Sequence, residues 1–111
     1  MGQYKNGKMV KFLCEDYHYG WFDHESISYL LRTAAEIIGM TPLAGPYSAV
    51  VTGDGNNDGI SGVLIIKESH IAAHEWKFHS AIRIVVDSCK DFDCGGLIKF
   101  FSDFLAPSNL S

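Results

Sequence analysis

Residues 59–76 read GISGVLIIKESHIAAHEW, and the fold can be inferred by starting from this segment. Its first half, Ser61–Ile66, is a continuous apolar run of the length expected for a buried strand. After a break, Ser69–Trp76 is predicted to continue in extended form, and Ser80–Ser88 (SAIRIVVDS) is predicted as a further strand. Strands so close together in sequence indicate antiparallel pairing, because short connections cannot make a parallel crossover.

The flanking segments predict two helices and two more strands. Lys8–Glu15 alternates as a strand, and a helix is predicted from a cap at Asp23 to about Met40. Pro46–Thr52 reads as a short strand, and Gly95–Leu105 carries an apolar helical face. We therefore predict one α+β domain over residues 1–111, a two-layer sandwich of an antiparallel sheet with helices on one face. Such a protomer leaves one sheet face uncovered, which predicts a homodimer that forms a larger sandwich.

Composition excludes several classes of protein. The chain has 111 residues, 47% of them hydrophobic and 20% charged, which is typical of a globular domain. A net charge of −4 without a basic run argues against nucleic-acid binding. We find neither a membrane-spanning stretch nor a signal peptide, and therefore expect no membrane partner. Three cysteines do not make a disulfide framework, so we expect a cytoplasmic protein with free thiols.

The segment TGDGNNDGISG, residues 52–62, begins like a calcium-binding loop. Asp54, Asn56 and Asp58 alternate and Gly59 follows, as in the first half of that motif. The twelfth position is Ile65, where calcium requires a bidentate carboxylate, and the flanks read as strands. The composition is instead typical of a hairpin connection.

Several residues with reactive side chains lie in or just after the central stretch. Ser69 follows Glu68 after the apolar strand, His74 lies five residues further on, and Cys89 ends the next strand. Each has an ordinary structural explanation as a strand serine, a packed histidine or a small apolar cysteine. A zinc site formed by His70, His74, Cys89 and Cys94 is an alternative, but its spacing is looser than in known zinc motifs, and we expect no metal.

Taken together, the run GISGVLIIKESHIAAHEW followed by SCKD resembles the bacterial and archaeal S-adenosylmethionine decarboxylase proenzymes. In that family a G-[VI]-S-G strand leads into an E-S-H segment, with a histidine five residues and a cysteine twenty residues past the serine. The residues that fall in register without a gap are Ser61, Glu68, Ser69, His70, His74, Trp76 and Cys89. The similarity covers about Gly59–Cys89 and implies a fold like that of S-adenosylmethionine decarboxylase.

The resemblance implies self-processing between Glu68 and Ser69, giving chains 1–68 and 69–111. Ser69 would become a pyruvoyl group, the only cofactor expected, so that neither pyridoxal phosphate nor a metal is required. Ser61 and His74 would assist processing, with His74 as the base, and Cys89 would return a proton to the substrate carbon. The substrate amine would form a Schiff base with the pyruvoyl carbonyl, and in this family the site is shared across a homodimer.

The substrate is a small molecule, and two positions depart from the family pattern. Where family members that use S-adenosylmethionine carry a ribose-binding glutamate and an adenine-stacking phenylalanine, this chain has Phe78 and Gly55. Relatives on the same scaffold decarboxylate arginine or ornithine, whose distal cation needs an anion. The candidate substrate-binding residues are Asp54, Asp58, Glu75, Trp76 and Phe78.

We narrowly favour L-ornithine or L-arginine as the substrate, for a decarboxylase of polyamine biosynthesis. Two alternatives stay open. The first is S-adenosylmethionine decarboxylase proper, and the second is a non-enzymatic α+β module that binds a metal or another ligand and never processes Ser69.

Overall fold

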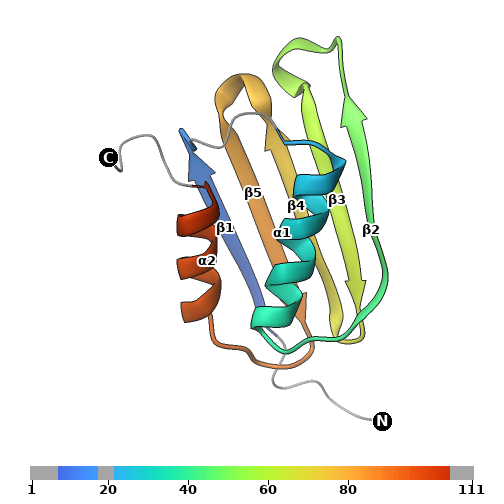
Figure 1. Cartoon of the computed structure of the whole chain (residues 1–111), viewed down its shortest axis with the longest axis vertical. Helices are drawn as coiled ribbons and strands as arrows, with labels where there is room; N and C mark the ends of the chain where they lie inside the picture. The colour runs from blue at the N-terminus through green and yellow to red at the C-terminus, as the bar shows by residue number, and fades with distance from the viewer. Residues whose placement is uncertain (1–7, 18–21, 106–111) are drawn as a thin grey trace.

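The computed structural model describes residues 8–17 and 22–105, which form one antiparallel sheet with two helices over one of its faces (Figure 1). The strand order is β1-β5-β4-β3-β2, and every neighbouring pair is antiparallel. The predicted α+β class and layer arrangement are confirmed. The elements in chain order are β1 (Lys8–Glu15), α1 (His24–Ile37), β2 (Pro42–Val51), the 3-10 turn η1 (Gly55–Asn57), β3 (Gly59–Ile66), β4 (Ser69–Trp76), the 3-10 turn η2 (Lys77–His79), β5 (Ala81–Ser88) and α2 (Gly95–Leu105).

Helix α1 begins at the predicted cap. The Asp23 carboxylate accepts the Ser26 N–H at 2.8 Å, and the Ser26 hydroxyl accepts the Asp23 N–H at 2.9 Å, so two otherwise unpaired donors are satisfied. The helix ends at Ile37, three residues before the predicted end at Met40. Gly39 takes a left-handed φ of 70° and closes the helix, whereas the Met40 side chain is still buried. The apolar sequence pattern therefore continues beyond the last helical residue.

Strand β2 begins at Pro42 rather than at Pro46, so the predicted start was wrong. It is an edge strand, where a proline without an N–H removes no sheet hydrogen bond when it faces outward. Two register shifts lie between Pro42 and Tyr47, which shows that the pairing with β3 accommodates this segment irregularly.

The hydrophobic core lies between the sheet and the helices. Ile27, Leu31 and other apolar residues of α1 are fully buried against it. Gly62 of β3 permits this packing, since a Cβ there would lie 3.1 Å from Ile27 Cγ2 and from Leu31 Cδ1. No helix in residues 8–17 and 22–105 is long and apolar enough to cross a membrane.

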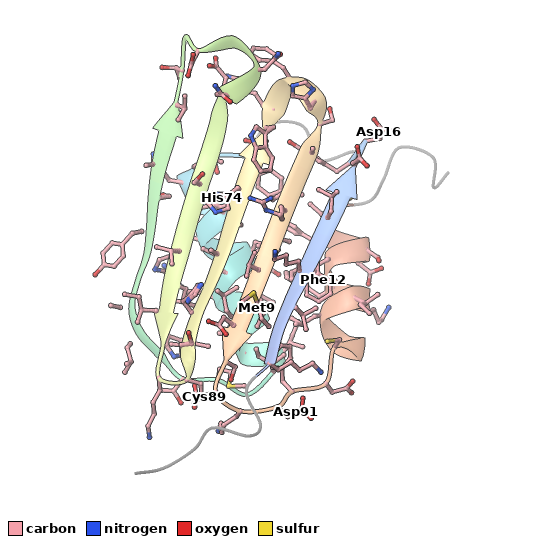
Figure 2. All side chains as sticks on the ribbon, turned by 180° about the vertical axis from the view of Figure 1, so that it is seen from behind. Met9, Phe12, Asp16, His74, Cys89 and Asp91 are labelled. Atoms are coloured by element: carbon pink, nitrogen blue, oxygen red, sulfur yellow. The ribbon has the colours of Figure 1, made fainter. Side chains whose placement is uncertain are left out.

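We call the side of the sheet away from the helices the open face. It is seen from the front in Figure 2, which labels Met9 and His74. Large apolar side chains are exposed on the open face, with Met9 60%, Leu13 64%, Tyr47 58% and Ile65 42% accessible. Strand alternation places His70, Ala72 and His74 of β4 on this face, whereas Ile71, Ala73 and Glu75 face the helices and are buried.

Candidate active site

The connection between β2 and β3 is a hairpin loop organised by Asp58. Its carboxylate accepts the N–H of Gly53 at 3.0 Å and that of Asp54 at 2.6 Å, and the residue is buried. Both carboxylate oxygens therefore hold the turn. Asp54 itself is exposed and accepts a hydrogen bond from Asn57 Nδ2 at 3.3 Å. Gly55 belongs to the short turn η1.

The turn between β3 and β4 consists of two residues, because Ile66 pairs directly with Ser69. The Lys67 N–H donates to the Thr41 carbonyl at 2.8 Å. The Glu68 carboxylate accepts the Thr41 N–H at 3.4 Å and pairs with Lys90 Nζ at 3.4 Å. Desolvation opposes ionisation of Glu68, but the Thr41 N–H and Lys90 outweigh it and lower the pKa of the carboxyl. The turn is thus held in place from both sides.

The Glu68 carbonyl, which belongs to the peptide bond before Ser69, has its own donor. The Cys89 N–H donates to this oxygen at 2.9 Å. A fixed N–H on a carbonyl oxygen draws electrons from the carbon and stabilises negative charge that develops there during nucleophilic attack. The Cys89 thiol is free, and the residue is exposed at the end of β5. The backbone of Cys89 is therefore placed at this bond.

Two polar side chains surround the Ser69 hydroxyl. Ser69 Oγ donates to Asp87 Oδ2 at 3.2 Å, and His70 Nδ1 lies 3.2 Å from the same Oγ. His70 and Asp87 are cross-strand partners in β4 and β5, with 3.9 Å between Nδ1 and Oδ2. Sequence reasoning did not select Asp87. The signal was available, because Asp87 lies two residues before Cys89 on a predicted strand and so shares its face.

Ser61 and His74 form a second polar pair on the open face. They are register partners in β3 and β4, and Ser61 Oγ lies 2.9 Å from His74 Nδ1. Burial, and secondarily the positive charge of Arg83, lower the pKa of His74. Arg83 is the cross-strand partner of His74 in β5, and its guanidinium lies 5.3 Å from the Trp76 ring centre. Both effects favour the neutral imidazole, the form that a general base requires.

Within one protomer these two groups are far apart. Ser69 and His74 are five residues apart on β4, which corresponds to about 17 Å along a strand. Figure 2 shows Cys89 at one end of the sheet and His74 further along it. We call the first group the Ser69 cluster (Glu68, Ser69, His70, Asp87 and Cys89) and the second the His74 cluster (Ser61, His74, Trp76 and Arg83). A single chain contains both clusters but does not bring them together.

The other predicted substrate-binding residues lie in different environments. Glu75 is buried on the helix side of the sheet, where it accepts hydrogen bonds from Tyr17 Oη and from the Phe22 N–H. Burial and the Glu75 carboxylate raise the pKa of Tyr17 far above its ordinary value. Phe78 lies in η2 and is 56% exposed. The Lys77 N–H donates to the Asp58 carbonyl at 3.0 Å, so the β2–β3 loop meets η2 near Trp76, while the Glu75 carboxylate faces the helices.

The zinc alternative has no matching geometry in the part of the chain that the structure describes. Residues 8–17 and 22–105 contain no group of three or more His, Cys, Asp or Glu side chains placed to hold a metal ion. His70 and His74 are four residues apart on one strand, and their nearest polar neighbours are Ser69 and Ser61, respectively.

Comparison with known proteins identifies relatives of the chain. The sequence model of the S-adenosylmethionine decarboxylase family matches residues 20–111. The structure is similar to the crystal structure of the adenosylmethionine decarboxylase from Aquifex aeolicus VF5, with a TM-score of 0.73 and 20% sequence identity. That match covers 94% of this chain and 83% of the other, and it shows a shared fold. A search of curated proteins gave no match.

Proposed function

The chain belongs to the S-adenosylmethionine decarboxylase family of pyruvoyl-dependent carboxy-lyases in polyamine synthesis, and from that premise we propose that it cleaves itself between Glu68 and Ser69. One observation carries the proposal. The Glu68 carbonyl accepts the Cys89 N–H at 2.9 Å directly beside the Ser69 hydroxyl, so an electrophile and a nucleophile adjoin the same peptide bond.

The cleavage proceeds in three balanced steps. Ser69 Oγ attacks the Glu68 carbonyl carbon, and the C–N bond breaks to leave an ester and a free Ser69 amine. A base then removes the Ser69 α-proton, and the Cβ–O bond breaks, which releases residues 1–68 with a new carboxylate at Glu68. Water adds to the resulting dehydroalanine and ammonia leaves, so that residues 69–111 begin with a pyruvoyl group.

The Ser69 cluster fits that group, because the reacting serine begins β4 and the carbonyl before it is held by a backbone donor. A pyruvoyl group at position 69 would supply an electron-withdrawing carbonyl for a substrate amine, which is the chemistry that loss of carbon dioxide requires. Cys89 is then the proposed proton donor to the substrate carbon, since it carries a free thiol and follows Ser88, the cross-strand partner of Ser69. No metal or further cofactor takes part in this proposal.

We assign α-proton removal to His74, oriented by Ser61, and we propose that the His74 cluster comes from a second copy of the chain. The pKa of His74 is lowered, which keeps the imidazole neutral and able to accept a proton. The distance of about 17 Å along β4 separates it from Ser69 of its own chain. A homodimer packed through the open face, where Leu13 and Tyr47 are exposed, would complete two shared sites.

For the substrate we propose S-adenosylmethionine, as the family suggests. Asp58 and Glu75, two of the three carboxylates considered for the cation of a basic amino acid, are occupied by hydrogen bonds inside the protomer. Phe78 and Gly55 favour ornithine or arginine as the second candidate, because the expected adenosyl contacts are missing at these positions. Asp54 is the exposed carboxylate that remains for such a substrate.

Intact-mass analysis of purified protein tests self-processing. We expect two chains, residues 1–68 and residues 69–111, the second carrying a pyruvoyl group and blocked to Edman sequencing. The variant Ser69→Ala, which lacks the nucleophile, should stay a single chain. A wild-type chain that remains uncleaved after incubation would overturn the proposal.

Carbon dioxide release from S-adenosylmethionine, L-ornithine and L-arginine, assayed side by side, tests the substrate. We expect release from S-adenosylmethionine. Release from ornithine or arginine alone would show that Phe78 and Gly55 mark a changed substrate, and Asp54→Asn should then reduce that activity.

A further inference from the structure

We propose that Asp87 is the base that takes the hydroxyl proton of Ser69 in the first step of self-processing, an inference that rests on the proposed function. Ser69 Oγ donates to Asp87 Oδ2 at 3.2 Å. An ionised carboxylate only accepts hydrogen bonds, so this contact points the serine proton towards Asp87. Asp87 therefore touches a reacting atom.

The placement of Asp87 on β5 explains why this base suits the reaction. Two residues further along the chain, the Cys89 N–H donates to the Glu68 carbonyl at 2.9 Å. One strand thus supplies a proton acceptor for the nucleophile and a donor for the electrophile, while β4 supplies the nucleophile. Since β4 and β5 are paired through Ser69↔Ser88 and His70↔Asp87, the sheet fixes the three groups relative to one another.

The two histidines of β4 are the other possible acceptors. His74 of the same chain is about 17 Å along the strand from Ser69, and the partner's His74 is the base already assigned to the later elimination step. His70 Nδ1 is 3.2 Å from Ser69 Oγ and 3.9 Å from Asp87 Oδ2. When Nδ1 carries a proton it donates to Ser69 Oγ, which leaves Asp87 as the acceptor for the serine proton. We therefore assign His70 a positioning role.

The step balances without an outside reagent. The proton moves from Ser69 Oγ to Asp87 Oδ2 as the bond from Oγ to the Glu68 carbon forms, and the carbonyl electron pair moves to the oxygen that the Cys89 N–H holds. The proton then passes from Asp87 to the Ser69 nitrogen as the C–N bond breaks. Asp87 ends unchanged, and the ester between Glu68 and Ser69 remains.

This assignment divides self-processing between two subunits. The ester-forming step uses groups of one chain, whereas the elimination step uses His74 of the other. A chain that carries His74→Ala should therefore form the ester and stop there. Hydroxylamine splits an ester but leaves the peptide bond intact, so it reports the first step alone.

The test follows ester formation in newly synthesised His74→Ala protein by adding hydroxylamine at intervals during cell-free translation and resolving the fragments by gel. Adding Asp87→Asn should slow ester formation about 100-fold, in the range typical of losing a general base. Asp87→Glu, which keeps the carboxylate, should recover at least about tenfold of that loss. His70→Gln should change the rate only a few-fold, as expected for a group that positions rather than accepts. The matched control is Asp103→Asn, which removes the same charge from an exposed residue of α2.

Thermal unfolding separates chemistry from folding. Asp87 is about one-third exposed, and asparagine has nearly the same shape as aspartate. We therefore expect the protein with Asp87→Asn to melt within a few degrees of the parent protein that carries Asp87. Ester formation at an unchanged rate in Asp87→Asn would overturn the proposal, as would a rate lost in His70→Gln but kept in Asp87→Asn. If His74→Ala forms no hydroxylamine-sensitive bond while wild type is still cleaved, the order of steps is wrong and Asp87 loses its role. An uncleaved wild type would instead overturn the proposed function itself.

Discussion

His74 shows how the neighbours of one residue can favour its uncharged form, which the proposed base of self-processing needs. Burial disfavours the charged imidazole, the positive charge of Arg83 adds to that effect, and the Ser61 hydroxyl fixes the ring at 2.9 Å. Because the lowered pKa keeps the ring neutral, the base should stay active at pH values below the ordinary histidine range. We therefore expect His74 to lose its function as a base only when the pH is low enough to protonate the ring.

Arg83→Gln should shift to higher pH the range in which the rate of self-processing falls on acidification. Removal of the positive charge leaves burial as the remaining cause of the shift, so the pKa of His74 rises towards its ordinary value. The fraction of neutral imidazole at a given acidic pH then falls. The measurement is the rate at which residues 69–111 appear as a function of pH, with Lys99→Gln on α2 as the charge-matched control. An identical acid limb in both variants would exclude Arg83 as a contributor.

Cys89 offers a way to separate the two reactions proposed for this enzyme. Its backbone N–H donates to the Glu68 carbonyl, and this donor is present whichever side chain residue 89 carries. Cys89→Ala should therefore cleave itself at a rate within a few-fold of wild type. Decarboxylation should fall about 100-fold, because the thiol that returns the proton is missing. Mass analysis and carbon dioxide release on the same sample make the comparison. Equal losses in both reactions would contradict this division of roles.

At the scale of elements, Gly59 sets the close approach of β3 to the end of β4. A Cβ at this position would lie 1.8 Å from the backbone oxygen of Glu75, far inside any tolerable contact. We expect Gly59→Ala to displace the backbone and to lower the free energy of unfolding by about 3 kcal/mol. For a domain of this size that corresponds to a fall in melting temperature of more than about 10 °C. The register of Ser61 with His74 should suffer as well.

Gly95→Ala is the matched control, since a Cβ there would approach only the Asp93 side chain, at 3.5 Å. Alanine is favoured over glycine within a helix, so this variant should melt at or slightly above the wild-type temperature. Calorimetry of the two variants, both built on Ser69→Ala so that every chain is intact, gives the comparison. Similar melting temperatures would show that β3 and β4 can separate there at little cost.

The sequence pattern within a segment was enough to predict several of the strands and helices. The bounds of β1, β4 and α2 agree with the prediction, because alternation and helical periodicity are properties of the segment itself. The end of α1 was placed too late because the buried Met40 continues the apolar pattern after the helix has ended. The start of β2 was placed too late, at Pro46 instead of Pro42, and an edge strand tolerates both prolines.

The candidate site was less predictable, since it depends on strand register. The contact between Ser69 and Asp87 arises from pairing between β4 and β5, which no short segment encodes. The position of Glu75 was available from alternation, because it lies between His74 and Trp76 and must face the helices. Its engagement with Tyr17 and Phe22 involves residues more than fifty positions away, and only the fold reveals it.

At the scale of the whole molecule, the open face is the feature that a single chain does not explain. Apolar residues of three strands are exposed in its layer, among them Met9, Tyr47 and Ile65. Isolated exposed apolar residues are common, but a sheet layer that carries several of them together is typical of an interaction surface. A two-fold axis between two packed open faces, perpendicular to β4 and level with its middle, would place Ser69 of each copy opposite His74 of the other.

Co-expression of two inactive variants tests this arrangement directly. Ser69→Ala lacks the nucleophile and His74→Ala lacks the elimination base, so neither should be cleaved alone. In a mixed dimer, Ser69 of the His74→Ala chain meets His74 of the Ser69→Ala chain, and one complete site forms. With random pairing about half of the His74→Ala chains have such a partner. We therefore expect about half of them to yield residues 1–68 and 69–111, detected by a tag on that chain alone.

The control partner carries both substitutions and should restore no cleavage. Absence of cleavage in the first mixture, with mixed dimers demonstrated by affinity capture, would mean that each chain must complete its own site and that β4 rearranges to bring His74 to Ser69.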